Sequence, residues 1–193
     1  EYYMQSFIIN AGKKIDSITE MSVNDSKLIT GREFFPFPWS PDISLEALPS
    51  IAVQEAGIPW FFDLKETLEE NMSNPHFDLK DYIRNNSKKA KDRGASAIIL
   101  YNTSAIDDKL AFDSKDRSEK LDIPVLYISR PAAEKYFSDK TATLTLKMRV
   151  GISDKTRIGH NVIGYIDNKA TSTVVLGAHF DHLGYGEDGN SRH

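Results

Sequence analysis

The sequence predicts an α/β protein, and three patterns carry this prediction. Residues 95–101 form a nearly continuous apolar run, which is typical of a strand covered on both faces. The segment before it, residues 79–93, has its apolar side chains close to one face and ends at Gly94, a pattern that predicts a helix. Residues 142–150 alternate strictly between apolar and polar side chains, which predicts a half-buried strand. A helix followed by strands of both kinds indicates a sheet with flanking helices.

The remaining elements follow in chain order. Short strands are expected at residues 7–9 and 15–23. Residues 34–50 combine four prolines with aromatic side chains, so we expect an irregular loop with short strands. Its rings are expected to pack against the core, and the alternative is an exposed binding surface. A second buried strand is expected at 123–128, after which Ser129 caps a short helix at 131–137.

The last forty residues have their own pattern. The polar stretch 153–156 is expected to interrupt the chain and is a candidate domain junction. Two apolar runs follow, at 161–166 and 173–178, and residues 167–169 between them predict a hairpin.

Composition narrows the classes of function. The chain has 193 residues, enough for one large domain or two small ones. Its 24 basic and 28 acidic residues give a formal net charge of −4, which argues against a nucleic-acid partner. It contains no apolar run of the roughly 18 residues that would span a membrane. The absence of cysteine excludes disulfides, thiolate metal sites and a cysteine nucleophile. The oligomeric state is not predicted.

The strongest candidate for a functional site follows the run 173–178. That run leads directly into His179, Phe180, Asp181 and His182, and ligands of open α/β sheets bind beyond the carboxyl ends of strands. Side chains two apart share a face of an extended chain, which places Asp181 beside His179. A carboxylate that accepts one ring N–H of a histidine orients the other nitrogen toward a metal. We therefore expect His179 as a metal ligand and Asp181 as its orienting carboxylate. The alternative is a hydrogen-bonded pair without metal.

Other candidates have simpler explanations. The basic side chains at the end of the predicted helix, Lys88, Lys89, Lys91 and Arg93, could bind phosphate. A solvated face that complements the helix dipole explains them better. His182 is expected to order its loop, and His76 and His160 are expected to be structural or exposed. Glu187 and Asp188 lie in a glycine-flanked turn and are not expected to bind metal.

The residues around this histidine carry a family resemblance. Residues 161–166 and 174–184 resemble the start of the catalytic domain of a zinc exopeptidase family, that of aminopeptidase Y and the glutamate carboxypeptidase-like enzymes, which use two co-catalytic zinc ions. Residues 88–101 and 123–129 resemble the core of the protease-associated (PA) domain that many members carry before this motif. Residues 2–7 resemble the peptidase segment that precedes the PA domain.

The resemblance implies a domain organisation and a fold. Residues 1–27 are expected to be an N-terminal segment of the α/β zinc-peptidase domain. Residues 28–153 are expected to form an inserted PA-like β-sandwich or open barrel with flanking helices. Residues 154–193 are expected to begin the catalytic domain.

The resemblance also implies a function. The parent enzyme is expected to be an extracytoplasmic zinc aminopeptidase acting on peptides, with His179 binding one zinc beside Asp181. The family's remaining metal ligands and general base are expected downstream, so this chain alone should be inactive and bind zinc weakly or not at all. Two alternatives stay open: a carboxypeptidase or dipeptidase of the same family, and a non-catalytic PA-type interaction module.

Overall fold

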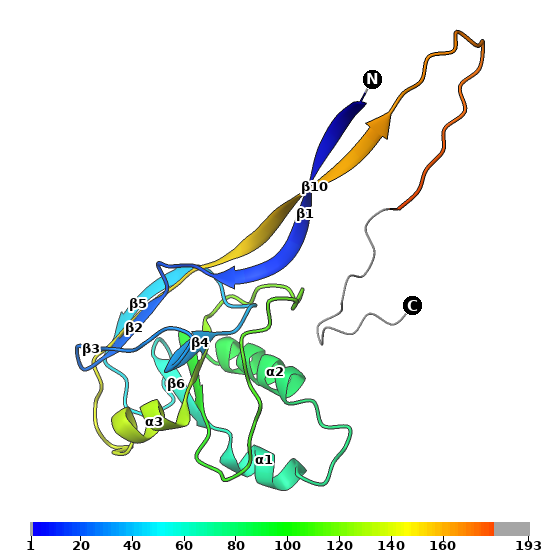
Figure 1. Ribbon diagram of the computed structural model, residues 1–193. Helices are drawn as coiled ribbons and strands as arrows, with labels where there is room; N and C mark the ends of the chain where they lie inside the picture. Colours follow the sequence, from blue (N-terminus) through cyan, green and yellow to red (C-terminus); the bar gives the residue numbers. More distant parts are fainter. Residues whose placement is uncertain (1, 180–193) are drawn as a thin grey trace. The chain divides into compact units, whose positions relative to one another are not determined.

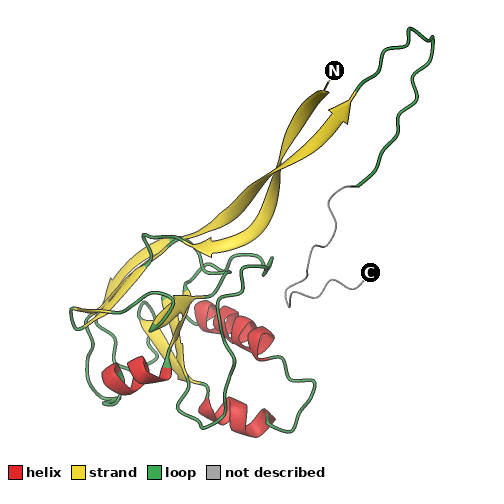
Figure 2. Ribbon diagram, in the orientation of Figure 1, coloured by secondary structure: helices red, strands yellow, loops and turns green. Residues whose placement is uncertain are grey.

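The chain folds into a mixed α/β structure whose largest part is built on two four-stranded sheets, seen here in a computed structural model that describes residues 2–179 (Figures 1 and 2). Contacts divide the chain into two units. One comprises residues 8–159, and the other comprises residues 1–7 with 160–193.

The central sheet of the larger unit has the strand order β4-β8-β7-β6. Its strands are β4 (Phe34–Pro36), β6 (Pro59–Asp63), β7 (Ala97–Tyr101) and β8 (Val125–Ile128). Strands β6, β7 and β8 run parallel, and β4 is antiparallel to β8. All five residues of β7 are buried, which confirms the prediction of a strand covered on both faces.

The second sheet has the order β3-β2-β9-β5 and is antiparallel throughout. Its strands are β2 (Glu20–Val23), β3 (Ser26–Lys27), β5 (Ile43–Ala47) and β9 (Leu146–Val150). The side chains of β9 alternate between buried and exposed, which confirms the predicted half-buried strand. The strand begins at Leu146, four residues later than expected, and residues 142–145 contribute an isolated bridge between Thr143 and Ser50 in place of regular strand pairing.

Two cores lie on opposite faces of the central sheet. One core contains alternate residues along β6 and β7, including Phe61, Ile99 and Tyr101. These side chains pack with residues of both sheets and of α3 (Arg130–Tyr136). The intervening residues, including Trp60, Ile98 and Leu100, pack with the face that carries α1 (Lys65–Asn71) and α2 (Leu79–Asp92). The period-two alternation of a strand therefore places the helices α1 and α2 on one side and the second sheet on the other.

Helix α2 ends where the sequence predicts. Asp78 caps its first turn by accepting a hydrogen bond from the backbone N–H of Asp81 at 3.1 Å. Gly94 follows the helix with φ +102°, a left-handed conformation that glycine adopts without steric cost. Helix α3 lies within a residue of its predicted bounds, but the Ser129 side chain makes no capping hydrogen bond, so that detail of the prediction was wrong.

The proline-rich segment packs inward. Phe37 and Trp39 are 1% and 2% exposed, and their rings stack with centroids 4.7 Å apart. This confirms that the aromatic side chains of residues 34–50 belong to the core instead of an exposed binding surface.

A two-stranded sheet pairs β1 (Tyr2–Ile15) with β10 (Ile152–Gly164). The first strand is 14 residues long, where a short strand was expected. The polar stretch 153–156, expected as a break, lies inside β10. Its polar side chains suit a strand that is exposed over most of its length. The prediction of a break was therefore wrong, because it relied on hydrophilicity alone. The domain boundaries after residues 27 and 153 stay predictions.

The predicted hairpin at 161–178 is also wrong in part. Residues 161–164 belong to β10, but residues 173–178 form no strand. Val174, Val175 and Leu176 are 83%, 86% and 94% exposed. An apolar run forms a buried strand only where a neighbouring strand and a covering layer exist, and the described residues supply neither.

Candidate functional site

The predicted metal site lies at the end of the described part of the chain. His179 is exposed and follows the exposed run 173–178. Asp181, His182, Glu187 and Asp188 lie outside the described residues. The pairing of His179 with Asp181 therefore stays a prediction.

The described residues do not supply a complete zinc site. Across residues 2–179, no group of three or more His, Asp and Glu side chains is arranged to hold a metal ion. A catalytic zinc normally has three protein ligands and a water. The imidazole of His179 does not by itself fit a zinc ion, and no catalytic step through zinc can be assigned to the described residues.

The two other histidines of the described residues lie on the surface. His76 and His160 are both exposed. Of the basic residues near the end of α2, Lys91 forms an ion pair with Asp122 at 2.9 Å. This pair holds the pKa of Lys91 above its usual value, because the carboxylate accepts a hydrogen bond from the ammonium group and attracts its charge.

A polar network that sequence reasoning missed lies at the carboxyl edge of the parallel strands. Strands β6 and β7 end at Asp63 and Tyr101, and Asn102 follows directly. Asp63 accepts hydrogen bonds from the backbone N–H and the hydroxyl of Thr103. The signal was present in the sequence: a polar residue directly follows a fully apolar run at 97–101. Such positions lie where α/β sheets hold ligands.

Asn102 is the centre of this network and is 2% exposed. Its amide nitrogen donates to the carbonyl of Ile106 at 2.9 Å and to Asp108 Oδ2 at 2.8 Å. Its amide oxygen accepts from the backbone N–H and the hydroxyl of Ser104, at 2.8 and 2.7 Å. The buried amide is therefore fully paired, which fixes the start of the long loop between β7 and β8.

The aromatic hydroxyls of the network are held protonated. Tyr127 donates its hydroxyl to Asp108 Oδ2 at 2.6 Å. Burial and this hydrogen bond raise the pKa of Tyr127 far above its ordinary value. Burial and the nearby Asp63 carboxylate also raise the pKa of Tyr101. Phenols in this state donate hydrogen bonds at neutral pH and do not act as bases. The network therefore anchors the loop between β7 and β8.

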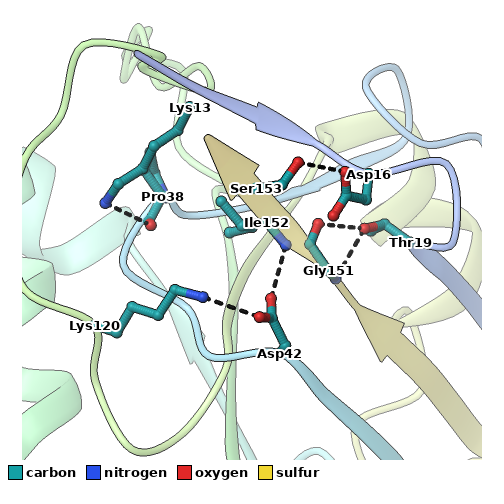
Figure 3. Close-up of polar contacts among 9 residues, drawn as sticks. All are labelled: Lys13, Asp16, Thr19, Pro38, Asp42, Lys120, Gly151, Ile152 and Ser153. Atoms are coloured by element: carbon teal, nitrogen blue, oxygen red, sulfur yellow. Dashed lines mark hydrogen bonds and ion pairs between the residues drawn. The ribbon is translucent and has the colours of Figure 1, made fainter. Parts of the chain in front are cut away.

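A second cluster joins the two ends of the larger unit where β1 stops and β10 begins (Figure 3). The hydroxyl of buried Thr19 donates to the carbonyl of Gly151 at 2.9 Å and accepts from its N–H at 3.0 Å. The backbone N–H of Asp16 donates to the same carbonyl at 2.9 Å. The hydroxyl of Ser153 donates to Asp16 Oδ1 at 2.6 Å.

Asp42 ties this cluster to β5. One of its carboxylate oxygens accepts from the backbone N–H of Ile152 at 2.9 Å, and the other pairs with Lys120 at 3.1 Å (Figure 3). The backbone hydrogen bond, followed by the bond to the lysine, lowers the pKa of Asp42. Lys13 donates to the carbonyl of Pro38 at 3.1 Å. These contacts fix β1 and β10 to the core of the larger unit at their shared base.

Among the described residues, no helix has the length and apolar character needed to cross a membrane.

Comparison with known proteins gives structural neighbours alone. No family model matches the chain, and no curated protein sequence matches it. Among solved structures, an aminopeptidase from Aneurinibacillus sp. strain AM-1 aligns with 84% of this chain and 37% of its own length, at 20% identity and a TM-score of 0.44.

Two further neighbours are of the same kind. The zinc aminopeptidase BSAP from Bacillus subtilis aligns with 84% of this chain at 20% identity and a TM-score of 0.45. A peptidase M28 precursor from Shewanella amazonensis SB2B aligns with 84% of this chain at 16% identity and a TM-score of 0.43. The aligned regions cover 36% and 40% of those chains, so this chain spans well under half the length of these neighbours.

Proposed function

We propose that this chain is the N-terminal part of a zinc-dependent aminopeptidase that releases N-terminal residues from peptides outside the cytoplasm. The observation that carries the proposal is the spacing of His179 and Asp181 directly after an apolar run of strand character. In this proposal the His179 ring binds one of two zinc ions, and Asp181 accepts the other ring N–H and sets the tautomer. Zinc would supply Lewis-acid chemistry, with its remaining ligands from residues outside those described here.

The exposure of several apolar residues supports the proposal that further strands of the peptidase domain cover them. Val174, Val175 and Leu176 expose most of their surface. Ile166 is 90% exposed and Met4 is 68% exposed. Large exposed apolar patches are typical of interfaces, and residues 174–176 are three consecutive exposed apolar residues. In our proposal these segments are strands of the peptidase sheet, and its other strands cover them.

The larger unit, residues 8–159, contains the segment 28–153 that we propose to be the PA-like domain, which modulates access of peptides to the catalytic site. It contains every buried hydrophobic residue found in the part of the chain described here. A unit with its own core can act as a rigid lid or spacer beside a cleft. Strands β1 and β10 are anchored at its base by the Thr19 and Asp42 contacts.

The experiment uses the complete enzyme that this proposal implies. Zinc content is measured by plasma mass spectrometry, and hydrolysis of leucine-p-nitroanilide is followed by absorbance. We expect two zinc equivalents and hydrolysis, with His179→Ala losing about one equivalent and at least about 100-fold in rate. His160→Ala removes an exposed imidazole from β10 and serves as the matched control. Full zinc and activity in His179→Ala would contradict the proposed ligand.

A non-catalytic interaction module is the second candidate, and a specific observation favours it. The larger unit has a complete core and a polar carboxyl edge without any metal cluster in the described residues. The same experiment separates the candidates, because a module contains no zinc and hydrolyses nothing. A carboxypeptidase or dipeptidase would contain zinc and hydrolyse substrates that lack the anilide group.

A further inference from the structure

A pocket of about 210 Å³ lies between the helices and the edge of the central sheet. Its floor comes from alternate residues of β6 and β7, and its walls come from α2 and the start of α1. The apolar lining is formed by Trp60, Phe62, Leu64, Ile83, Ile98 and Leu100. Sites for small molecules are concave, mostly apolar, and carry few polar groups, which describes this pocket.

The pocket exists because α2 presents small side chains to the sheet. Ser87 and Ala90 lie one turn apart on the helix and are 2% and 3% exposed. Larger side chains at these two positions would fill the space between helix and strands. The composition of α2 thus leaves room at a place where packing is normally dense.

One residue of the pocket lining has a polar group that lacks a partner. The Ser87 hydroxyl is buried, and no hydrogen-bond partner for it occurs among residues 2–179. Buried hydroxyls are nearly always paired, because an unpaired one loses its hydrogen bonds to water. A polar ligand atom in the pocket would accept or donate that missing hydrogen bond.

The rim of the pocket carries positive charge at one end. Lys89 and Arg93 line it, and neither forms an ion pair within the described part of the chain. By contrast, Lys91 on the same helix is paired with Asp122. The Arg93 guanidinium lies 5.1 Å from the centre of the Trp60 ring, at the apolar floor. An anion would therefore find two unpaired cations beside an aromatic surface.

The opposite end of the pocket is unsuitable for an anion. Asp63 lines that end, at the last residue of β6, while Trp60 lies near the first. Three residues of a strand separate their backbones by roughly 10 Å, and the odd spacing turns the two side chains to opposite faces of the sheet. The negative charge of Asp63 at this end favours a ligand orientation with the anionic group toward Arg93.

We propose that this pocket binds a small aromatic carboxylate. Its ring lies against the half-buried Phe62, its carboxylate pairs with Lys89 and Arg93, and the Ser87 hydroxyl completes its hydrogen bonds. The size agrees, because cavities of about 150 Å³ hold a benzene ring. The site is separate from His179 and Asp181, so it goes beyond the proposed peptidase function.

The test is a titration of the 193-residue chain followed by NMR of its backbone amides. Phenylacetate, phenethylamine and acetate are the probes, because they separate the ring from the charge. We expect phenylacetate to bind with a Kd on the order of 1 mM and to shift the amides of Ser87, Ala90 and Arg93. Phenethylamine and acetate should bind at least about tenfold more weakly. Equal binding of phenethylamine, or no shifts at concentrations far above 1 mM, would overturn the proposal.

Three variants locate the binding. Ala90→Leu fills the pocket and should abolish the shifts. A second hollow is also lined by Ser87 but not by Ala90, so this variant distinguishes the two. Arg93→Gln should weaken binding about threefold to tenfold. Lys88→Gln is the matched control, because it removes the same charge from α2 outside this pocket and should leave the Kd unchanged. Undiminished binding by folded Ala90→Leu or by Arg93→Gln would refute the site.

Discussion

The Thr19 hydroxyl holds together two segments that lie 132 residues apart in sequence, so its removal should be costly. Thr19 is 4% exposed, and its oxygen both donates to and accepts from Gly151. Thr19→Val keeps the β-branched shape and removes only the hydrogen-bonding group. The variant therefore tests the anchoring of β1 and β10 with little change in packing volume.

The structure sets the size of the expected loss. Both hydrogen bonds of Thr19 disappear, each worth about 0.5–1.5 kcal/mol. The carbonyl of Gly151 keeps the N–H of Asp16 as a donor, but the buried N–H of Gly151 loses its partner. We expect the free energy of unfolding to fall by about 2–3 kcal/mol, which lowers Tm by about 5–10 °C for a domain of this size.

Thermal and urea unfolding of the 193-residue chain, followed by circular dichroism, measure this loss. Thr156→Val is the matched control, because Thr156 is exposed on β10 and its stability change should stay within about 0.5 kcal/mol. If Thr19→Val lowered Tm no more than Thr156→Val did, the assigned role of the Thr19 hydroxyl would be refuted.

Three further predictions concern the same unit. Gly12→Ala should lower the free energy of unfolding, measured by urea unfolding, by at least about 1 kcal/mol. The reason is that Gly12 has φ +107° and that an added Cβ would clash with the carbonyl oxygen of Ser114. Ile99→Ala, at a fully buried position, should cost about 3–4 kcal/mol in the same assay, and a loss below about 1 kcal/mol would contradict its place in the core. Asp42→Asn keeps an acceptor for Ile152 but removes the charge. Because folding lowers the pKa of Asp42, its charge stabilises above an unfolded pKa of about 4, and this contribution is lost as pH falls through the folded pKa. The wild type should thus be more stable than Asp42→Asn at pH 6, and the difference in unfolding free energy should vanish toward pH 2. A difference that did not change with pH would contradict the role assigned to the charge of Asp42.

The elements that could be predicted from sequence are those whose pattern reflects local packing. The apolar run of β7 and the alternation of β9 both record which faces are covered, and both were confirmed. Helix α2 was predicted from one apolar face and from Gly94, whose positive φ follows directly from its lack of a side chain. These signals depend on residues within a few positions of each other.

The errors fall where burial depends on distant partners. Residues 153–156 look like a loop because they are polar, yet they lie in β10, which pairs with β1. The run 173–178 has the composition of a buried strand, but a strand also needs a neighbour, and the described residues offer none. The composition of a segment indicates how strongly its side chains prefer burial, but it does not indicate which other segment will pair with it or cover it.

The sequence by itself determined the chemistry that this protein can offer: the order of helix and strands in its core, the absence of thiol chemistry, and the His179–Asp181 spacing. Only the tertiary structure decided which distant residues meet. It brought Thr19 to Gly151, buried Asn102 at the carboxyl edge, and opened a pocket beside Ser87 with Arg93 at its rim. The physical reason is that side-chain identity is encoded locally, whereas hydrogen bonds and cavities arise between segments that can lie more than 130 residues apart in the chain.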